Sequence, residues 1–174
     1  MRGCRSISPG SRSSLGGRRA RSPSSGPRST SWSVCEEGLL ASVAALLAEV
    51  LYRLGRDEEA EEWTRRSERA ASLEDVEAQA FWRIVRAKVP ARRGNAEEAL
   101  RLSAEAVEWV HRSDSLPVIG DCLSDRAEVL RLLGRPDEAR PLLGEALAVY
   151  ERKGIVPSIE RTRTLLAEIP AGPR

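Results

Sequence analysis

The feature that most constrains the fold of this chain is a short segment that occurs three times at a nearly constant interval. In each copy a glycine is followed five residues later by an alanine, and acidic residues stand directly before that alanine. The glycines are Gly55, Gly94 and Gly134 and the alanines are Ala60, Ala99 and Ala139, so the interval is 39 and then 40 residues. A period of this length is typical of stacked structural repeats, and the sequence therefore predicts a repeat architecture.

Apolar residues recur every three to four positions on both sides of each glycine, which predicts two helices per copy. The first helix begins near residue 36, and its apolar stripe consists of Leu39, Val43, Leu46, Leu47, Val50, Leu51 and Leu54. Each glycine ends the first helix in a left-handed conformation that other residues adopt only at a cost. Each alanine lies where the two helices cross closely.

Helix pairs of this kind cannot bury their apolar faces alone, so they stack. We expect an all-α, right-handed α-solenoid of about three helix pairs plus a C-terminal capping helix. The units fall at about 36–71, 72–112 and 115–153, and the capping helix falls at 157–169. Ser72 and Asp75 are expected to cap the first helix of the second unit, which would begin near Leu73.

Pro90 conflicts with the helical pattern of the second unit. A proline inside a helix removes a backbone hydrogen bond and clashes with the preceding turn, at a cost of about 3 kcal/mol. We therefore expect that helix to kink or to end near Val89, and the second unit to be mobile.

Charge is distributed unevenly along the chain. Residues 1–35 hold seven arginines and no acidic residue. The whole chain has 28 basic and 26 acidic residues, so 21 basic and 26 acidic residues lie outside this segment, which gives that part a net charge of −5. Because residues 1–35 are rich in Arg, Ser, Gly and Pro, they are predicted to form a disordered tail, and residues 170–174 a disordered end. Nucleic acid or an anionic surface is therefore an expected partner of the tail only, and not of the acidic repeat region.

The sequence offers little for catalysis. His111 is the only histidine, and there is no glycine-rich phosphate loop, GxGxxG or HExxH motif. Cys4, Cys35 and Cys122 form neither a disulfide framework nor a zinc motif. No apolar run approaches the roughly 20 residues of a membrane helix, and no secretion signal is present. We predict a cytoplasmic, non-catalytic protein without cofactor, metal or small-molecule substrate.

Further positions make the pattern more specific, and with them the units resemble tetratricopeptide repeats. The matching residues are Leu47, Ala48, Leu51 and Ser67 in the first unit, Ala87 and Ala106 in the second, and Leu123, Ala127, Leu130, Leu143 and Ala146 in the third. Arg86 and Pro90 stand where the family usually has leucine or an aromatic residue. The resemblance covers about residues 36–169.

The period of about 40 exceeds the 34 residues of the simplest tetratricopeptide repeats. Longer units, and segments such as LLAEVLYRLGRDEEAEEW and LRLLGRPDEA, are similar to the C-terminal repeat arrays of bacterial regulators. Those regulators join an ATPase module to a nucleotide-cyclase or DNA-binding domain, and no such segment occurs here. The resemblance thus implies a detached sensor end or a stand-alone relative.

The resemblance also implies a concave surface, lined by the first helix of each unit, that binds protein or peptide. The candidate positions are Glu49, Tyr52, Arg53, Ile84, Lys88, Arg92, Ser124, Glu128 and Arg131, with Ala45 beside them. Their mixed charge and single tyrosine suit an extended or helical peptide; the alternative is that they are ordinary solvated helix faces. Glu49 and Glu128 stand where family members that clamp a terminal carboxylate have asparagine, so that activity is not expected.

Three hypotheses for function follow. The first is a non-catalytic scaffold that binds another protein, or another domain of a parent protein, through the concave face. The second is the regulatory or sensor fragment of a larger ATPase-type signalling protein, and the third is an adaptor that uses its basic tail on nucleic acid or a membrane surface.

Overall fold

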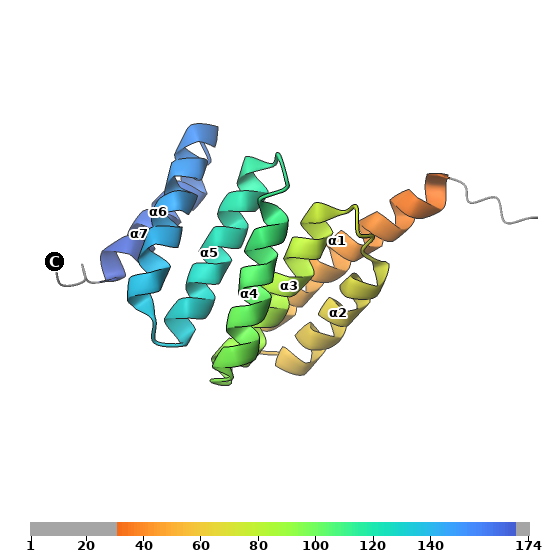
Figure 1. Ribbon diagram of the computed structural model, residues 1–174, viewed down its shortest axis with the longest axis horizontal. Helices are drawn as coiled ribbons and strands as arrows, with labels where there is room; N and C mark the ends of the chain where they lie inside the picture. Colours follow the sequence, from red (N-terminus) through yellow and green to blue (C-terminus); the bar gives the residue numbers. More distant parts are fainter. Residues whose placement is uncertain (1–30, 170–174) are drawn as a thin grey trace, which may run out of the picture.

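The structure, a computed structural model, describes residues 31–169, and their side chains from residue 39 onward. Within this range the chain forms seven α-helices and no strand. They are α1 (Ser31–Arg53), α2 (Asp57–Ala70), α3 (Val76–Arg92), α4 (Ala96–Val110), α5 (Leu116–Leu132), α6 (Pro136–Lys153) and α7 (Val156–Glu168). The chain reverses direction at each loop, and the helices stack side by side along the long axis of the molecule (Figure 1).

The helices are organised in pairs. The most extensive contacts join α1 to α2, α3 to α4 and α5 to α6, and the first helices of successive pairs also contact each other, α1 with α3 and α3 with α5. The second helix of each pair packs on the first helix that follows it, and α7 packs on α6. The predicted all-α solenoid of three helix pairs and a final helix is therefore confirmed.

The turns within the pairs depend on glycine as predicted. Gly55, Gly94 and Gly134 have φ between 70° and 78°, and a Cβ at any of them would meet no atom within 4 Å. The requirement for glycine is thus the left-handed backbone itself and not the surrounding space. After each glycine the next residue donates its N–H to a carbonyl five residues back, at 2.8–2.9 Å, which satisfies the open end of the helix. Gly154, which the periodicity did not single out, forms the same turn before α7.

The repeated alanines lie where helices approach closely. Ala60, Ala99 and Ala139 are completely buried, each in a cluster of apolar side chains from neighbouring helices. The core contains many such small residues and few aromatic ones, in agreement with an aromatic content of 4%.

Helix starts differ from the prediction at two places. The helix α1 begins at Ser31, so residues 31–35 belong to it rather than to the predicted tail, while residues 1–30 and 170–174 lie outside the described residues. The helix α3 begins at Val76 and not near Leu73. Asp75 alone caps it by accepting from the N–H of Ala78 at 3.0 Å, and the Ser72 hydroxyl accepts from Asp75 in the turn before.

The prediction that α3 ends near Val89 was wrong, while a kink at this point and a mobile second unit stay predictions. The helix continues to Arg92. Its length, 17 residues, equals that of α5. Pro90 lies close to the end, where Arg93 still donates to the carbonyl of Val89 and Asn95 to that of Pro90. Only the bond to the Arg86 carbonyl is lost, and the buried proline ring joins the packing instead. Pro141 also lies inside a helix, α6, but it is exposed and lies near the start of that helix.

Two glycines inside helices make a matched pair for stability measurements. A Cβ on Gly120 would lie 2.7 Å from Cε1 of the fully buried Tyr150, whereas a Cβ on Gly144 would meet nothing within 4 Å. We expect Gly120→Ala to lower the free energy of unfolding by about 1–3 kcal/mol, because the ring has no room to move. Gly144→Ala should raise it by about 1 kcal/mol. Urea unfolding followed by circular dichroism measures both, and a stabilising Gly120→Ala would contradict the close contact.

Candidate functional site

Two adjoining cavities lie along the side of the solenoid that the first helices form. Their volumes are about 200 and 420 Å³, and both are lined by Arg53 from α1, Asp125 from α5 and Arg161 from α7. We call them together the inner groove. Its remaining lining residues are Ala45, Leu46, Glu49, Phe81, Val85, Asp121, Ser124, Glu128, Arg131, Leu143 and Leu165. The inner groove is therefore a polar, mixed-charge surface with an apolar floor.

One fully buried lysine lies beneath the inner groove. The Lys88 ammonium lies 2.9 Å from Glu49 Oε2, 2.9 Å from Asp125 Oδ1 and 3.4 Å from Glu128 Oε2. These carboxylates come from α1 and α5, and Lys88 comes from α3 between them. We call the four residues the Lys88 cluster. Because a buried charge is stable only when it is paired, the cluster fixes the three inner helices relative to one another.

The pKa values in the cluster reflect burial and mutual charge. Burial alone lowers the pKa of Lys88, but the three carboxylates outweigh it and hold that pKa above its ordinary value. Burial raises the pKa of Asp125 to about 6, because attraction to Lys88 offsets it only in part and Glu49 and Glu128 repel its charge. At Glu49 burial acts in the same direction, but Lys88 and Arg53 lower the pKa below its usual value.

Tyr52 joins the cluster to the rim of the solenoid. Its hydroxyl donates to Glu128 Oε1 at 2.9 Å, and the guanidinium of Arg92 stacks on its ring, 3.8 Å from the centroid. Burial, together with the Glu128 charge, raises the pKa of Tyr52 to about 12. Arg92 is also held by the Tyr52 carbonyl and by Asp57 at the start of α2. These contacts serve the packing of α1 on α3.

The candidate residues from the sequence therefore separate into two groups. Glu49, Arg53, Ser124, Glu128 and Arg131 line the inner groove. Tyr52, Ile84 and Lys88 are buried, and Arg92 is engaged with α1 and α2, while Ala45 is buried but still contributes to the groove lining. Sequence reasoning treated all of them as surface positions, because the periodicity of one helix does not show how deeply its neighbours cover it.

Three charged residues of the inner groove were missed: Asp121, Asp125 and Arg161. Asp121 and Asp125 lie one turn before and one residue after Ser124, on the same face of α5. Arg161 was missed because α7 was treated only as a cap, although it takes the place of the first helix of a fourth unit. The repeat itself held the signal, since position 161 follows position 121 by one period of 40 residues.

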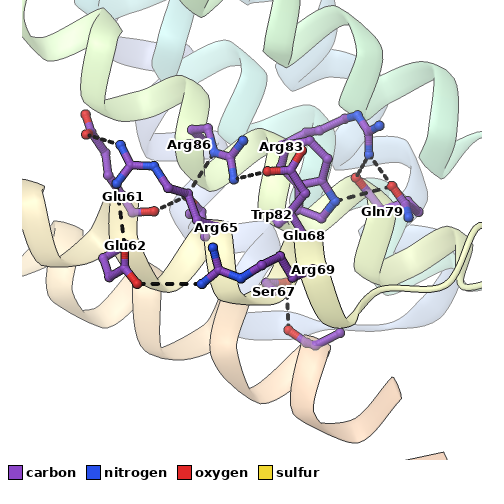
Figure 2. A network of polar contacts seen from close by, with 12 residues as sticks. Glu61, Glu62, Arg65, Ser67, Glu68, Arg69, Gln79, Trp82, Arg83 and Arg86 are labelled. Carbon is purple, nitrogen blue, oxygen red and sulfur yellow. Dashed lines mark hydrogen bonds and ion pairs between the residues drawn. The ribbon is translucent and has the colours of Figure 1, made fainter. Parts of the chain in front are cut away.

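A second polar network lies between α2 and α3 (Figure 2). The guanidinium groups of Arg83 and Arg86 both lie over the Trp82 ring, at 4.0 and 4.4 Å from its centroid. Arg86 also donates to Thr64 at 3.0 Å and pairs with Glu68 at 2.8 Å. These partners explain how arginine replaces the leucine that is usual in the family at position 86. Trp82 itself is buried and Trp109 is half-buried.

Other single residues also have structural positions. Cys122 is buried in α5, which raises the pKa of its thiol, and it packs as a small apolar group. His111 ends α4 with an exposed side chain whose Nε2 lies 4.0 Å from Glu145. Among residues 31–169 no helix is long and apolar enough to cross a bilayer.

The stacked helix pairs and the groove along their first helices place the protein in the class of α-helical repeat solenoids. Two family profiles, both described as tetratricopeptide repeat, match residues 41–66 and 78–152. Their 26 and 75 residues make up more than half of the 174-residue chain. The chain belongs to the tetratricopeptide repeat family.

A solved structure supports the same fold. The crystal structure of a TPR-like protein from Chlorobium tepidum is similar, with a TM-score of 0.57 and 21% sequence identity. The similarity covers 80% of this chain and 99% of that protein, and at this identity it concerns the fold alone. No curated protein sequence matches the chain.

Proposed function

We propose that this chain is a non-catalytic scaffold that binds an extended segment of a partner protein in the inner groove. Tetratricopeptide repeat domains are in general protein-interaction scaffolds. The observation that carries the proposal is the pair of adjoining cavities, which together run from α1 across α5 to α7. A groove that spans several helices suits an extended chain better than a compact small molecule.

The charges of the groove indicate what kind of segment it takes. Four carboxylates, those of Glu49, Asp121, Asp125 and Glu128, contribute to the lining, and so do the guanidinium groups of Arg53, Arg131 and Arg161. A segment that alternates basic and acidic side chains around an apolar residue would pair with both signs while its apolar residue contacts the floor. Complementary charge of this kind sets specificity and association rate more than affinity.

Charge reversal in the groove is the test. The probe is an array of 12-residue peptides of varied charge, and the measured quantity is binding of the labelled full chain. In Arg131→Glu/Arg161→Glu we expect affinity for the peptides that bind the wild type to fall at least about tenfold. Arg65→Glu/Arg101→Glu is the matched control, because both arginines are exposed and ion-paired on the second helices α2 and α4. If the two double variants lose the same peptides to the same extent, the inner groove is not the binding site.

Lys88 is unsuitable for this test, since its ammonium is fully buried and its replacement would act on folding. The same groove could serve another domain of a parent protein, as the hypothesis of a regulatory fragment requires. The hypothesis of a regulatory fragment stays a prediction. The hypothesis based on the basic tail stays one too, because residues 1–30 lie outside the described part of the chain.

A further inference from the structure

The helix α1 presents an apolar stripe to solvent. Its members are Leu39, Leu40, Val43, Leu46 and Val50, together with Leu54 directly after the last residue of α1, each between 50% and 68% exposed. We call them the α1 stripe. From residue 39 to residue 54 a helix rises by about 22 Å. An apolar surface of this extent on one helix indicates an interaction site.

Sequence reasoning assigned most of these residues to the core, and the structure reverses that assignment. The face of α1 that packs against α2 and α3 is formed by Ala41, Ala44, Ala45 and Ala48, with Leu51 and Tyr52. Small side chains allow the helices to approach closely, so the larger ones remain outside. The helix α1 therefore has two apolar faces: the alanine-rich face packs against α2 and α3, and the α1 stripe is a separate face that is exposed.

The repeat shows what kind of surface this face is. One period of 39 residues further on, the equivalents of Leu39, Val43, Leu46 and Val50 are Ala78, Trp82, Val85 and Val89. These four residues of α3 are at most 4% exposed. Val89, for example, packs with Leu51, Tyr52 and Ala60 of the preceding helix pair. The α1 stripe is therefore the equivalent of the face that is buried inside the solenoid in α3.

The two ends of the solenoid differ in polarity. This difference helps to identify what covers the α1 stripe. At the other end, α7 exposes mainly polar residues, including Glu160, Arg161, Arg163 and Thr164. Such a surface does not match the α1 stripe, so a head-to-tail contact between copies is disfavoured. Residues 1–30 contain only two large aliphatic residues, Ile7 and Leu15, which are too few to cover a stripe of six.

A second α1 stripe, in contrast, matches the first. Five residues of the stripe follow one another along the chain as Leu39, Val43, Leu46, Val50 and Leu54. Leucine and valine alternate, so their order is the same when the stripe is followed in either direction. In an antiparallel pair with its twofold axis near Leu46, valine meets valine and leucine meets leucine. Such a self-complementary contact is what a closed, symmetric dimer requires.

We propose that the α1 stripe binds the α1 stripe of a second copy of this chain, in an antiparallel, twofold-symmetric pair. This register also brings Leu54 of the second copy toward a further cavity of about 550 Å³ beside Leu40. Trp63 and the stems of Arg66 and Arg69 line that cavity, so the leucine enters an apolar space with a charged rim. Leu46 also lines the inner groove, so the two surfaces adjoin there, but the proposal does not rest on the function proposed for the groove.

Light scattering coupled to size-exclusion chromatography of the full chain tests the proposal. We expect a particle of about 38 kDa, twice the 19.1 kDa of one chain. Leu46→Glu should give the 19.1 kDa monomer with unchanged helicity, because two carboxylates would meet at the axis. Val156→Glu is the control: Val156 is 57% exposed but lies at the start of α7. This variant should remain dimeric.

A cysteine at the axis tests the orientation. In a chain that also carries Cys4→Ser and Cys35→Ser, Leu46→Cys should form an intermolecular disulfide on mild oxidation, while Val156→Cys should not. A monomeric wild type at micromolar concentration overturns the proposal, as does a dimer that Leu46→Glu leaves intact. A wild-type monomer that becomes dimeric when residues 1–30 are deleted also overturns it, because the occupant is then the chain's own N-terminal segment.

Discussion

Replacing Lys88 with methionine is expected to lower the free energy of unfolding by about 3–5 kcal/mol at pH 7. Methionine fills a similar volume, but it leaves the carboxylates of Glu49, Asp125 and Glu128 close together, with Arg53 still paired to Glu49 and no cation between the three. Removing one partner of a buried ion pair is costly because the other partner stays buried and uncompensated. Urea unfolding of the variant and of the wild type measures the difference.

The effect should depend on pH in a definite direction. In the wild type the raised pKa of Lys88 contributes stability that is fully present below about pH 10.5 and is lost as the pH rises further. Without Lys88 the carboxylates bind protons more readily in the native state than in the unfolded state. The destabilisation should therefore shrink as the pH falls from about 7 to about 4.5. A difference that does not change over this range would contradict the electrostatic explanation.

Asp125→Asn provides the matched control for Lys88→Met. The raised pKa of Asp125, about 6, means that its ionised form is held at a cost in the native state. Its contribution to stability increases as the pH falls from about 6 to about 4, and the asparagine variant should lose this dependence. Since Lys88 keeps Glu49 and Glu128 as partners, we expect Asp125→Asn to cost far less than Lys88→Met at pH 7.

Trp82→Ala is expected to have the second large effect, also a loss of about 3–5 kcal/mol. The ring is 4% exposed and packs with Ala87, Ala99 and Leu102, so its removal leaves a cavity in the middle of the stack. The variant also removes the ring on which Arg83 and Arg86 stack. Because each repeat is stabilised mainly by its neighbours, the pair α1–α2 should separate from the rest at lower urea.

Trp109→Ala is the control for this second prediction. Trp109 is half-buried on α4 and stacks with Arg112 at 4.5 Å, so its truncation removes less buried surface. We expect at most half the loss seen for Trp82→Ala. Equal losses would show that the central position of Trp82 between two helix pairs has no special weight.

The turns and the helix α1 show which features of the fold could be predicted from the sequence alone. Gly55, Gly94 and Gly134 were predicted correctly as left-handed helix ends, because that conformation depends on the residue itself and its immediate neighbours. For α1 the periodicity was correct, but the buried face was not: alanines pack inward and the larger aliphatic residues remain exposed. Both faces have helical spacing, so spacing alone could not distinguish them.

The candidate site shows the same division. The family resemblance, carried over to the first helix of each unit, implied Glu49, Arg53, Ser124, Glu128 and Arg131, all of which line the inner groove. It did not find that α7 contributes Arg161, because the sequence offered no following helix with which α7 could be paired. It also placed Lys88 at the surface, where a lysine normally lies.

The sequence by itself determined the helices, their turns, the repeat and the family, since these depend on contacts within a few residues or on a pattern repeated along the chain. Only the tertiary structure decided which charges are buried and which apolar residues are exposed. Lys88 is buried because carboxylates about 40 residues away on both sides, in α1 and α5, surround its ammonium. Leu46 is exposed because no helix pair precedes α1 among the described residues. Burial depends on neighbours in space, and one helix does not carry that information.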